Sequence, residues 1–376
     1  MTTRNEGGTP GGRRRATIRA VADAAGVSIG TVSNALNNPA MLAPATLARV
    51  QEAISSTGFI RSSAARSLAT RRSEGVGLVV PDIRNSLFVE IARGAQHLAR
   101  DKQLNLLLAN SGFSLESQRA DADHPDQQDQ FLDSFAEARM SGILLATMRD
   151  PREGLARIRD YVEPVVVINY DSPDADWCTV LMDNEAVGRR AVAHLAEIGR
   201  RSVLFLSPDD VVQPIADRRR GIREEAAARG VTLDEYRTDD LWGESGRRAA
   251  AAVLAAWEPG DQPLALLCVT DALALGALEV LRSRPEMRVP EDVAVMGMDG
   301  NYHAGGSDWI TLTSFDLPGY RMGEQAIELL LRELHDEDHH HERVLLPPEL
   351  SPRGSTVANL RGSSPPAASD FESRRW

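Results

Sequence analysis

The stretch from Ile18 to Asn38 constrains the fold more than any other part of this sequence, because two short helical patterns meet there at a glycine. Apolar residues recur at helical spacing at Ile18, Val21, Ala22 and Ala25 before the glycine and at Val32, Ala35 and Leu36 after it. Gly26 can end the first helix in the left-handed conformation, and the Ser28 hydroxyl can cap the second by accepting backbone N–H bonds. The pattern predicts a helix-turn-helix, whose second helix fits the major groove of DNA.

Charge separates this N-terminal part from the rest of the chain. Residues 1–73 hold ten Arg and three acidic residues, a balance of +7, whereas the remaining residues carry −19 and bring the net charge to −12. A basic head on an acidic body indicates that only the head meets a polyanion. An ordinary helical hairpin with a solvated polar face is the competing interpretation. The spacing, the glycine turn and the local positive charge together argue against it.

Composition excludes several classes of protein. No run of eighteen apolar residues occurs, so we expect no transmembrane helix and no membrane partner. The Arg-rich start has no apolar segment behind it, so we expect no secretory signal and a cytoplasmic protein. Cys178 and Cys268 are the only cysteines, and we expect packed thiols rather than a disulfide.

After residue 74 the pattern changes to apolar strands alternating with helices. The strand candidates are VGLVV, LNLLL, GILLA, PVVVIN, VLFL, LALLCV and VAVMGM. Strands that are apolar on both faces and separated by helices indicate parallel sheets covered on both sides. There are more strands than one small sheet needs.

Sequence motifs for catalysis, cofactor binding or metal binding would indicate an enzyme or a metal site. We find no nucleophile elbow, no phosphate-binding P-loop and no dinucleotide-binding glycine motif after a strand, and we expect no cofactor and no enzymatic role. The run His339–His341 lies in HDEDHHHERV, between a predicted helix and a predicted strand. Metal binding and a solvated crossover loop are the two interpretations of this run. We expect the loop, and no metal site.

The run TIRAVADAAGVSIGTVSNALNN resembles the N-terminus of the lactose-repressor (LacI/GalR) family of bacterial transcription regulators. The resemblance continues in order through GILLA, DRRRGIREEA, VTDALALGALEVL and RVPEDVAVMGMDG to LLPPELSPRGST, and covers about residues 17–356. It implies an N-terminal all-α helix-turn-helix head with a hinge helix. It also implies an α/β body of two parallel-sheet lobes like those of periplasmic binding proteins.

The expected domains follow the chain in order. They are a disordered arm (1–15), the helix-turn-helix domain (16–60), the hinge helix or linker (61–73), the effector-binding and dimerisation body (74–359) and a disordered tail (360–376). The resemblance implies lobe 1 at about 74–174 and 310–338, and lobe 2 at about 175–309 and 342–359. Three crossovers between the lobes are then expected near 172–176, 300–312 and 336–345.

The resemblance also implies which residues contact DNA. Ile29, Gly30 and Asn34 match residues of the recognition helix that contact base edges, and Asn34 can pair bidentately with adenine. Leu68 matches the leucine that is wedged into the minor groove from a hinge helix formed on the operator. The full expected set is Thr17, Ser28, Ile29, Gly30, Thr31, Ser33, Asn34, Asn37, Ser62, Ala65, Arg66 and Leu68.

Ligands of open α/β sheets bind beyond the carboxyl ends of the strands, so the polar residues there are effector candidates. Arg218 also matches the ligand-binding Arg of the family. The expected set is Asp82, Asn85, Phe88, Tyr170, Arg218, Thr270, Asp271, Asp299 and Asp316. Carboxylates, an Arg and aromatic rings suit a polyhydroxy ligand such as a sugar. Each residue taken alone can equally be a structural cap or an ion-pair partner.

We therefore predict a sequence-specific DNA-binding regulator, a repressor whose operator affinity is set by a small molecule between the lobes. The expected partners are that effector and double-stranded, pseudo-palindromic operator DNA, bound by a homodimer or a tetramer. Two alternatives share the body fold. One is a solute-binding protein, and the other is a sugar-binding or sugar-modifying protein with the head as an accessory.

Overall fold

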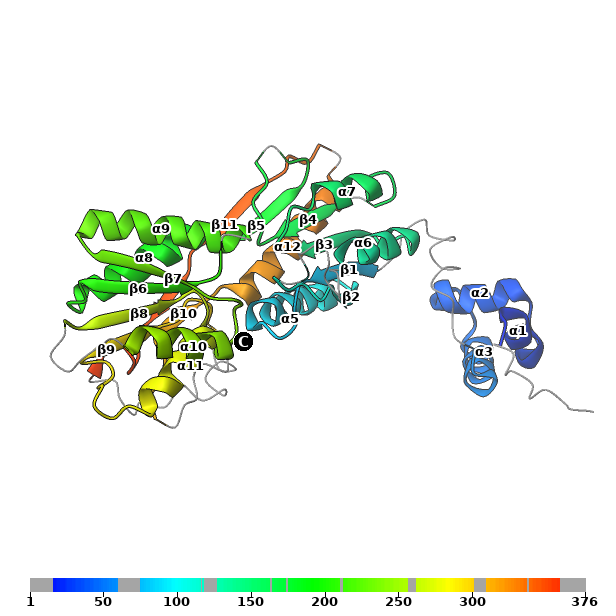
Figure 1. The fold of residues 1–376 in the computed structure, drawn as a ribbon. Helices are drawn as coiled ribbons and strands as arrows, with labels where there is room; N and C mark the ends of the chain where they lie inside the picture. The colour runs from blue at the N-terminus through cyan, green and yellow to red at the C-terminus, as the bar shows by residue number, and fades with distance from the viewer. Residues whose placement is uncertain are drawn as a thin grey trace, which may run out of the picture. The chain divides into compact units, whose positions relative to one another are not determined.

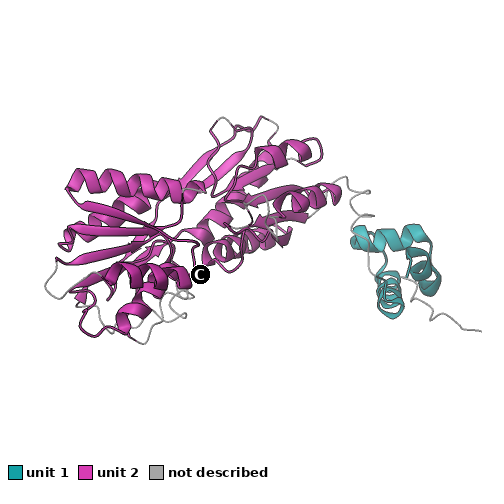
Figure 2. Ribbon diagram, in the orientation of Figure 1, with its two compact units in different colours: residues 1–73 teal, residues 74–376 magenta. Residues whose placement is uncertain are grey.

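The computed structural model describes residues 16–59 and 75–358, with gaps at 116, 118–126, 163, 174, 210–211, 256–261, 301–308 and 337. The chain divides into two compact units, residues 1–73 and residues 74–376 (Figure 2). The arm, the hinge helix and the tail expected from the sequence lie outside the described residues. In the described parts of the chain, every helix is too short or too polar to cross a membrane.

The first unit is the predicted helix-turn-helix. Its helices are α1 (Ile18–Ala25), α2 (Ile29–Asn37) and α3 (Pro44–Thr57), with a 3-10 turn, η1 (Pro39–Met41), between the last two. Gly26 ends α1 at a φ of 64°, in the left-handed region that favours glycine. The core consists of Val21, Ala22, Ala25, Val32, Val50 and Ala53. The core residues of α1 and α2 all come from the apolar faces predicted above.

The first sheet of the second unit has six parallel strands in the order β11-β5-β4-β3-β1-β2. Its strands are β1 (Gly75–Val80), β2 (Asn105–Asn110), β3 (Gly142–Ala146), β4 (Val165–Ile168), β5 (Cys178–Met182) and β11 (Arg343–Leu346). The helices around it are α5 (Ser86–Asp101), α6 (Gln128–Glu137), α7 (Arg152–Ile158) and α12 (Gly319–His335). Figure 1 shows this lobe with α5, α6 and α7 around its strands.

Both faces of the first sheet are covered, as the continuous apolar strands predict. Leu78 of β1 and Leu144 of β3 belong to the hydrophobic cluster that includes residues of α5 and α12. The neighbouring residues in sequence, Val79 and Leu145, belong to a second cluster with residues of α6 and α7. Because successive side chains of a strand point to opposite faces, this alternation places helices on both sides of the sheet.

The second sheet has four parallel strands in the order β7-β6-β8-β9. Its strands are β6 (Ser202–Ser207), β7 (Thr232–Arg237), β8 (Leu264–Cys268) and β9 (Val293–Met296), and its helices are α8 (Asn184–Glu197), α9 (Gln213–Arg229), α10 (Gly243–Leu254) and α11 (Asp271–Arg282). Figure 1 shows α8 and α9 on one face and α10 and α11 on the other. A short antiparallel pair, β10 (Ser314–Asp316) with β12 (Glu349–Ser351), adjoins β9 through a bridge from Met296 to Thr313.

The strand pairing moves the expected boundaries of the lobes. β5 and β11 pair within the first sheet, although the expected boundaries put both in lobe 2, and β10 adjoins the second sheet although 310–338 was expected in lobe 1. The chain therefore passes between lobes at Met182–Asn184, Asp316–Gly319 and Leu346–Glu349. The apolar pattern of a strand marks it as buried but does not select its partner, which explains the shifted boundaries.

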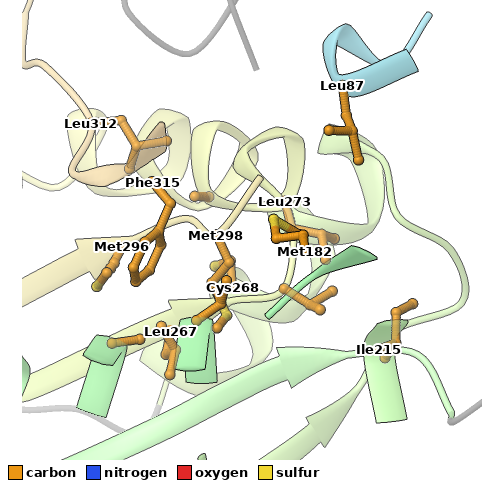
Figure 3. Close-up of a cluster of buried hydrophobic side chains, with 14 of the residues drawn as sticks. Leu87, Met182, Ile215, Leu267, Cys268, Leu273, Met296, Met298, Leu312 and Phe315 are labelled. Carbon is orange, nitrogen blue, oxygen red and sulfur yellow. The ribbon is translucent and has the colours of Figure 1, made fainter. Parts of the chain in front are cut away.

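One hydrophobic core continues from lobe to lobe. Leu87 of α5 and Met182 of β5 share a buried cluster with Leu273 of α11 and Phe315 of β10. Figure 3 shows part of this cluster, with Met182 close to Leu273. Cys268 lies in it as a buried free thiol, and Cys178 is also buried and free, as the sequence predicts.

Candidate functional site

Helix α2, the second helix of the helix-turn-helix, presents an exposed face at its first two turns. Ile29 is 41% exposed, which is unusual for a large apolar side chain, and Gly30 and Asn34 are exposed beside it. Within the described residues, the Asn34 amide has no hydrogen-bond partner. An exposed apolar side chain beside an unengaged amide can contact a thymine methyl group and a base edge.

Hydroxyl groups near this face hold the helices in place. The Ser28 Oγ atom accepts a bond from the Thr31 backbone N–H at 3.0 Å and lies 2.9 Å from the Thr31 hydroxyl. The Thr17 hydroxyl caps α1 by accepting from the Ala20 N–H at 3.3 Å. The Asn37 amide donates to the Ser33 hydroxyl at 3.2 Å. The remaining expected DNA contacts, Ser62, Ala65, Arg66 and Leu68, lie outside the described residues.

Two buried carboxylates face each other where β8 and β9 end. The Asp271 backbone N–H donates to Asp299 Oδ1 at 2.8 Å, and the Asp299 N–H donates to Asp271 Oδ1 at 3.3 Å. The Ser314 hydroxyl of β10 also donates to Asp271, at 2.5 Å. Both predicted residues are thus brought together, and Ser314 joins them from a strand far along the chain.

Burial sets the electrostatics of this pair. It raises the pKa of Asp271 well above its ordinary value of 3.8, and the negative charge of Asp299 raises that pKa further. Burial also raises the pKa of Asp299, while a bond from the Asp271 N–H and the Arg218 charge oppose the shift. The carboxyl oxygens of the pair can accept hydrogen bonds from hydroxyl groups of a ligand.

Arg218 lies in the same buried region, one turn before a close contact between helices. Its Nε donates to Asn184 Oδ1 at 2.9 Å and its Nη1 donates to the Val269 carbonyl oxygen at 3.0 Å. Burial lowers the pKa of Arg218, and the charges of Asp299 and Asp271 oppose that change. At Gly221, a Cβ atom would lie 2.2 Å from the Glu185 carbonyl oxygen of α8, so only glycine allows this spacing of α8 and α9.

The predicted residues after β1 have local partners. Asp82 pairs with Arg84 at 2.8 Å, and the Arg84 guanidinium lies 4.6 Å from the centre of the Trp242 ring. Asn85 caps α5 by accepting from the Leu87 N–H at 2.9 Å. Phe88 is 2% exposed and packs in the core. Their local partners give these side chains structural roles, whatever ligand binds beside them.

Polar atoms at the end of β4 lack partners. Among the described residues, Asn169 Oδ1 and Ser172 Oγ are buried without a hydrogen bond. Asn169 has a φ of 68°, a conformation that Asn tolerates better than most residues. Tyr170, the predicted residue beside them, is half-buried, and burial raises the pKa of its phenol. Buried polar groups normally find a partner, so these atoms are suited to bind a ligand or water.

Asp316 is placed differently from the other predicted effector residues. It is exposed on β10, accepts from the Ser351 hydroxyl at 2.5 Å and lies 3.8 Å from an Arg353 nitrogen. Thr270, by contrast, lies beside Asp271 and caps α11, accepting from the Leu273 N–H at 3.3 Å and donating to the Leu241 carbonyl oxygen at 2.8 Å.

Hydrogen bonds and a contact between a guanidinium group and an aromatic ring join the two lobes of the body. The Asp171 N–H donates to Gln213 Oε1 at 2.6 Å, and Gln213 Nε2 donates back to the Asp171 carbonyl oxygen at 2.9 Å. The Arg84 contact with Trp242 also joins the lobes. Asn184, Gln213, Ser314 and Trp242 were not among the predicted site residues. Gln213 and Asn184 open helices after strand ends, a signal that a wider search of such positions would have found.

Family models match both compact units of the chain, residues 1–73 and residues 74–376. The model described as "Bacterial regulatory proteins, lacI family" matches residues 17–62, and "Periplasmic binding protein-like domain" matches residues 192–356. The transcriptional repressor PurR of Vibrio cholerae serotype O1 (strain M66-2) is 30% identical over 354 residues, which cover 93% of this chain and all of PurR. The repressor CytR of Escherichia coli (strain K12) is 30% identical over 346 residues, covering 91% of this chain and 97% of CytR.

Solved structures of transcription regulators share the fold of this chain. The lac repressor dimer bound to operator and the anti-inducer ONPF has a TM-score of 0.76 at 20% identity and covers 92% of this chain and 100% of its own. The transcriptional regulator CelR in complex with cellobiose has a TM-score of 0.62 at 26% identity and covers 91% of this chain and 100% of its own. These matches confirm the predicted family and fold class. The named relatives are repressors, which agrees with the prediction of no enzymatic role.

Proposed function

Because the chain belongs to the LacI family of bacterial regulatory proteins, we propose that it is a repressor controlled by a polyhydroxy metabolite, with a sugar as the first candidate. DNA binding and an effector-binding body follow from the family. The class of the effector, the residues that hold it and the symmetry of the operator are the proposal. A regulator of DNA acts where the DNA is, so the proposal includes a cytoplasmic location.

The observation that carries the effector proposal is the buried cluster of Asp271, Asp299 and Arg218 at the carboxyl ends of β8 and β9. The cluster combines carboxyl acceptors with a guanidinium donor, which match the hydroxyl groups of a sugar. Asn169 and Ser172 add polar atoms without partners among the described residues. The cellobiose complex of CelR, a similar protein, supports a sugar as the first class to test.

A thermal-shift screen of the full chain tests this effector class. Mono- and disaccharides, sugar phosphates and nucleobases are added one at a time, because a ligand that binds only the folded state raises the melting temperature. We expect a sugar to raise it. Stabilisation by nucleobases alone would contradict the polyhydroxy proposal and leave the repressor assignment intact.

Variants then test the site. Asp271→Asn should lower affinity for the identified ligand at least about tenfold, because a buried ligand hydroxyl loses a charged partner. Tyr170→Phe removes one hydroxyl from a half-buried ring and should cost less. Arg218→Ala is a poor test, because it also breaks the bonds to Asn184 and Val269. Exposed Gln130→Ala on α6 is the control, and equal losses in all variants would contradict the assignment.

For DNA we propose direct base contacts from α2 and a wedge from the hinge. A dimer with two heads would match two half-sites of a pseudo-palindromic operator. Asn34→Ala should lower affinity for a selected operator by about 1–3 kcal/mol and relax the preference at one base pair. Leu68→Ala should weaken specific binding far more than nonspecific binding. Both are measured by fluorescence anisotropy at one stated salt concentration.

The controls for DNA binding use the same head. Arg49→Ala on α3 changes one exposed charge outside α2 and should weaken operator and random DNA to a similar, small extent. If Leu68→Ala also lowers both affinities equally, the wedge proposal is wrong. If the wild type shows no preference for any DNA sequence, with or without sugars, the proposal of a sequence-specific regulator is wrong.

A further inference from the structure

Four side chains with metal-binding atoms meet at one end of the first sheet. They are Cys178 at the start of β5, Glu333 near the end of α12, and His339 and His341 in the segment before β11. One ligand atom from each residue lies within 4.8 Å of the corresponding atom of every other. The sequence alone favours a solvated crossover loop at His339–His341, because the thiol that joins these histidines comes from 161 residues earlier in the chain.

The distances fit a tetrahedral ion. His339 Nε2 lies 3.1 Å from Cys178 Sγ, His341 Nδ1 lies 4.0 Å from the same sulfur, and Glu333 Oε2 lies 3.9 Å from His341 Nδ1. Bonds of about 2.0–2.3 Å to a tetrahedral Zn²⁺ place its ligands roughly 3.3–3.8 Å apart. These three separations lie within a few tenths of an ångström of that range, and the remaining pairs, all within 4.8 Å, would close by up to about 1 Å around such an ion.

The residue types select the kind of ion. One thiolate, two imidazoles and one carboxylate are ligands for Zn²⁺ and neighbouring first-row transition metals, whereas Mg²⁺ and Ca²⁺ prefer sites made only of oxygen. We propose that Cys178, Glu333, His339 and His341 bind one divalent transition-metal ion of the Zn²⁺ class.

The backbone beside the cluster is held toward the sulfur. The Glu342 backbone N–H donates to Cys178 Sγ at 3.3 Å and opposes the rise that burial causes in the pKa of the thiol. The Glu342 side chain is in turn held by Arg332 of α12 at 2.6 Å. Supporting contacts of this kind orient the ligands of metal sites and strengthen binding.

The position separates this site from the proposed effector site. Cys178 begins β5 and Arg343 begins β11, so the cluster lies at the amino edge of the parallel sheet. The effector candidates of this sheet follow the carboxyl ends of its strands, at the opposite edge. The ion would tie the end of α12 to the starts of β5 and β11 and so stabilise the first lobe.

Cobalt titration of the full-length, tag-free, metal-stripped protein tests the proposal. We expect one Co²⁺ per chain, with a thiolate-to-cobalt charge-transfer band in the near ultraviolet and the visible bands of a tetrahedral ion. Zn²⁺ should displace Co²⁺ and raise the melting temperature of the body. His339→Ala and Glu333→Gln should each lower the affinity at least about tenfold, and Cys178→Ala should abolish the charge-transfer band.

The neighbouring His340→Ala is the matched control, since this exposed histidine is outside the cluster. Its affinity for Co²⁺ should equal that of the wild type. Binding without a charge-transfer band, or equal losses in His340→Ala and His339→Ala, would overturn the proposal in favour of nonspecific binding by surface histidines. If Cys178→Ala does not fold, the wild-type spectrum and the His339→Ala and Glu333→Gln variants still distinguish the proposed site from nonspecific binding. Effector and operator binding are measured separately, so failure here leaves the proposed function unaffected.

Discussion

At the scale of single residues, the buried carboxyl groups of Asp271 and Asp299 make the stability of the body depend on pH. Their backbone N–H groups donate to each other's side chains, which orients both carboxyl groups. Burial disfavours the charged form of Asp271 and the nearby charge of Asp299 adds to this cost, so the pKa of Asp271 lies above its usual range. Hydrogen bonds from the hydroxyl groups of a ligand would offset part of this cost.

Asp271→Asn should reduce this pH dependence in the ligand-free protein, since the buried Asp299 remains. A raised folded-state pKa means that the folded state binds more protons than the unfolded state above about pH 4. The free energy of unfolding of the wild type should therefore fall, relative to the variant, as pH rises from the unfolded pKa to the folded pKa. Each unit of upward shift costs about 1.4 kcal/mol.

Urea denaturation of both proteins between pH 4 and pH 7 measures this difference. Asp316→Asn is the control, because it changes an exposed carboxylate and leaves the buried pair intact. Parallel stability curves for the wild type and Asp271→Asn would show that burial of Asp271 carries no cost.

At the scale of elements, two glycines in helices have opposite roles. Gly221 lets α9 approach α8 so closely that a Cβ atom would lie 2.2 Å from a carbonyl oxygen of α8. Gly30 of α2 has room, since its Cβ atom would meet only the Ser28 Oγ atom at 3.6 Å. The same substitution should therefore change stability in opposite directions at the two positions.

Gly221→Ala should destabilise the body by about 1–3 kcal/mol, because α8 and α9 must separate. It should also weaken effector binding, since Arg218 of α9 would move away from Asn184 of α8. Gly30→Ala should stabilise the head by up to about 1 kcal/mol, through the higher helix propensity of alanine. Calorimetry of the two variants measures both changes, and a wild-type transition for Gly221→Ala would contradict the packing argument.

At the scale of the whole molecule, ligand control depends on how the two lobes of the body contact each other. Gln213 of α9 makes two hydrogen bonds to the backbone of Asp171 beyond β4. A ligand can change operator affinity only by favouring one arrangement of the lobes over another. Contacts between the lobes therefore set how much of the ligand's binding free energy is needed to change the arrangement of the lobes.

Gln213→Ala should shift the ligand-free body toward a more open arrangement. The loss of two partly buried hydrogen bonds is worth about 1–3 kcal/mol, which should lower apparent effector affinity by up to about 100-fold. Small-angle scattering should show a larger radius of gyration without ligand and a normal one with saturating ligand. Exposed Gln130→Ala is the control, and an unchanged affinity in Gln213→Ala would exclude a role for this contact.

The fold of the head could be predicted from the amino-acid sequence, because the signals that specify it act over short distances along the chain. The apolar spacing of α1 and α2, the left-handed Gly26 and the Ser28 cap each act within a few residues. The positions of Asp271 and Asp299 at strand ends were predictable for the same reason, since a strand end is visible in the chain itself.

Only the tertiary structure decided which distant segments meet. It paired β5 and β11 in one sheet, brought Ser314 to Asp271, and placed His339 and His341 against Cys178. A buried strand, a hydroxyl or a histidine carries no local mark of its partner, because these contacts join segments separated by 43 to more than 160 residues. Packing of the complete body selects them.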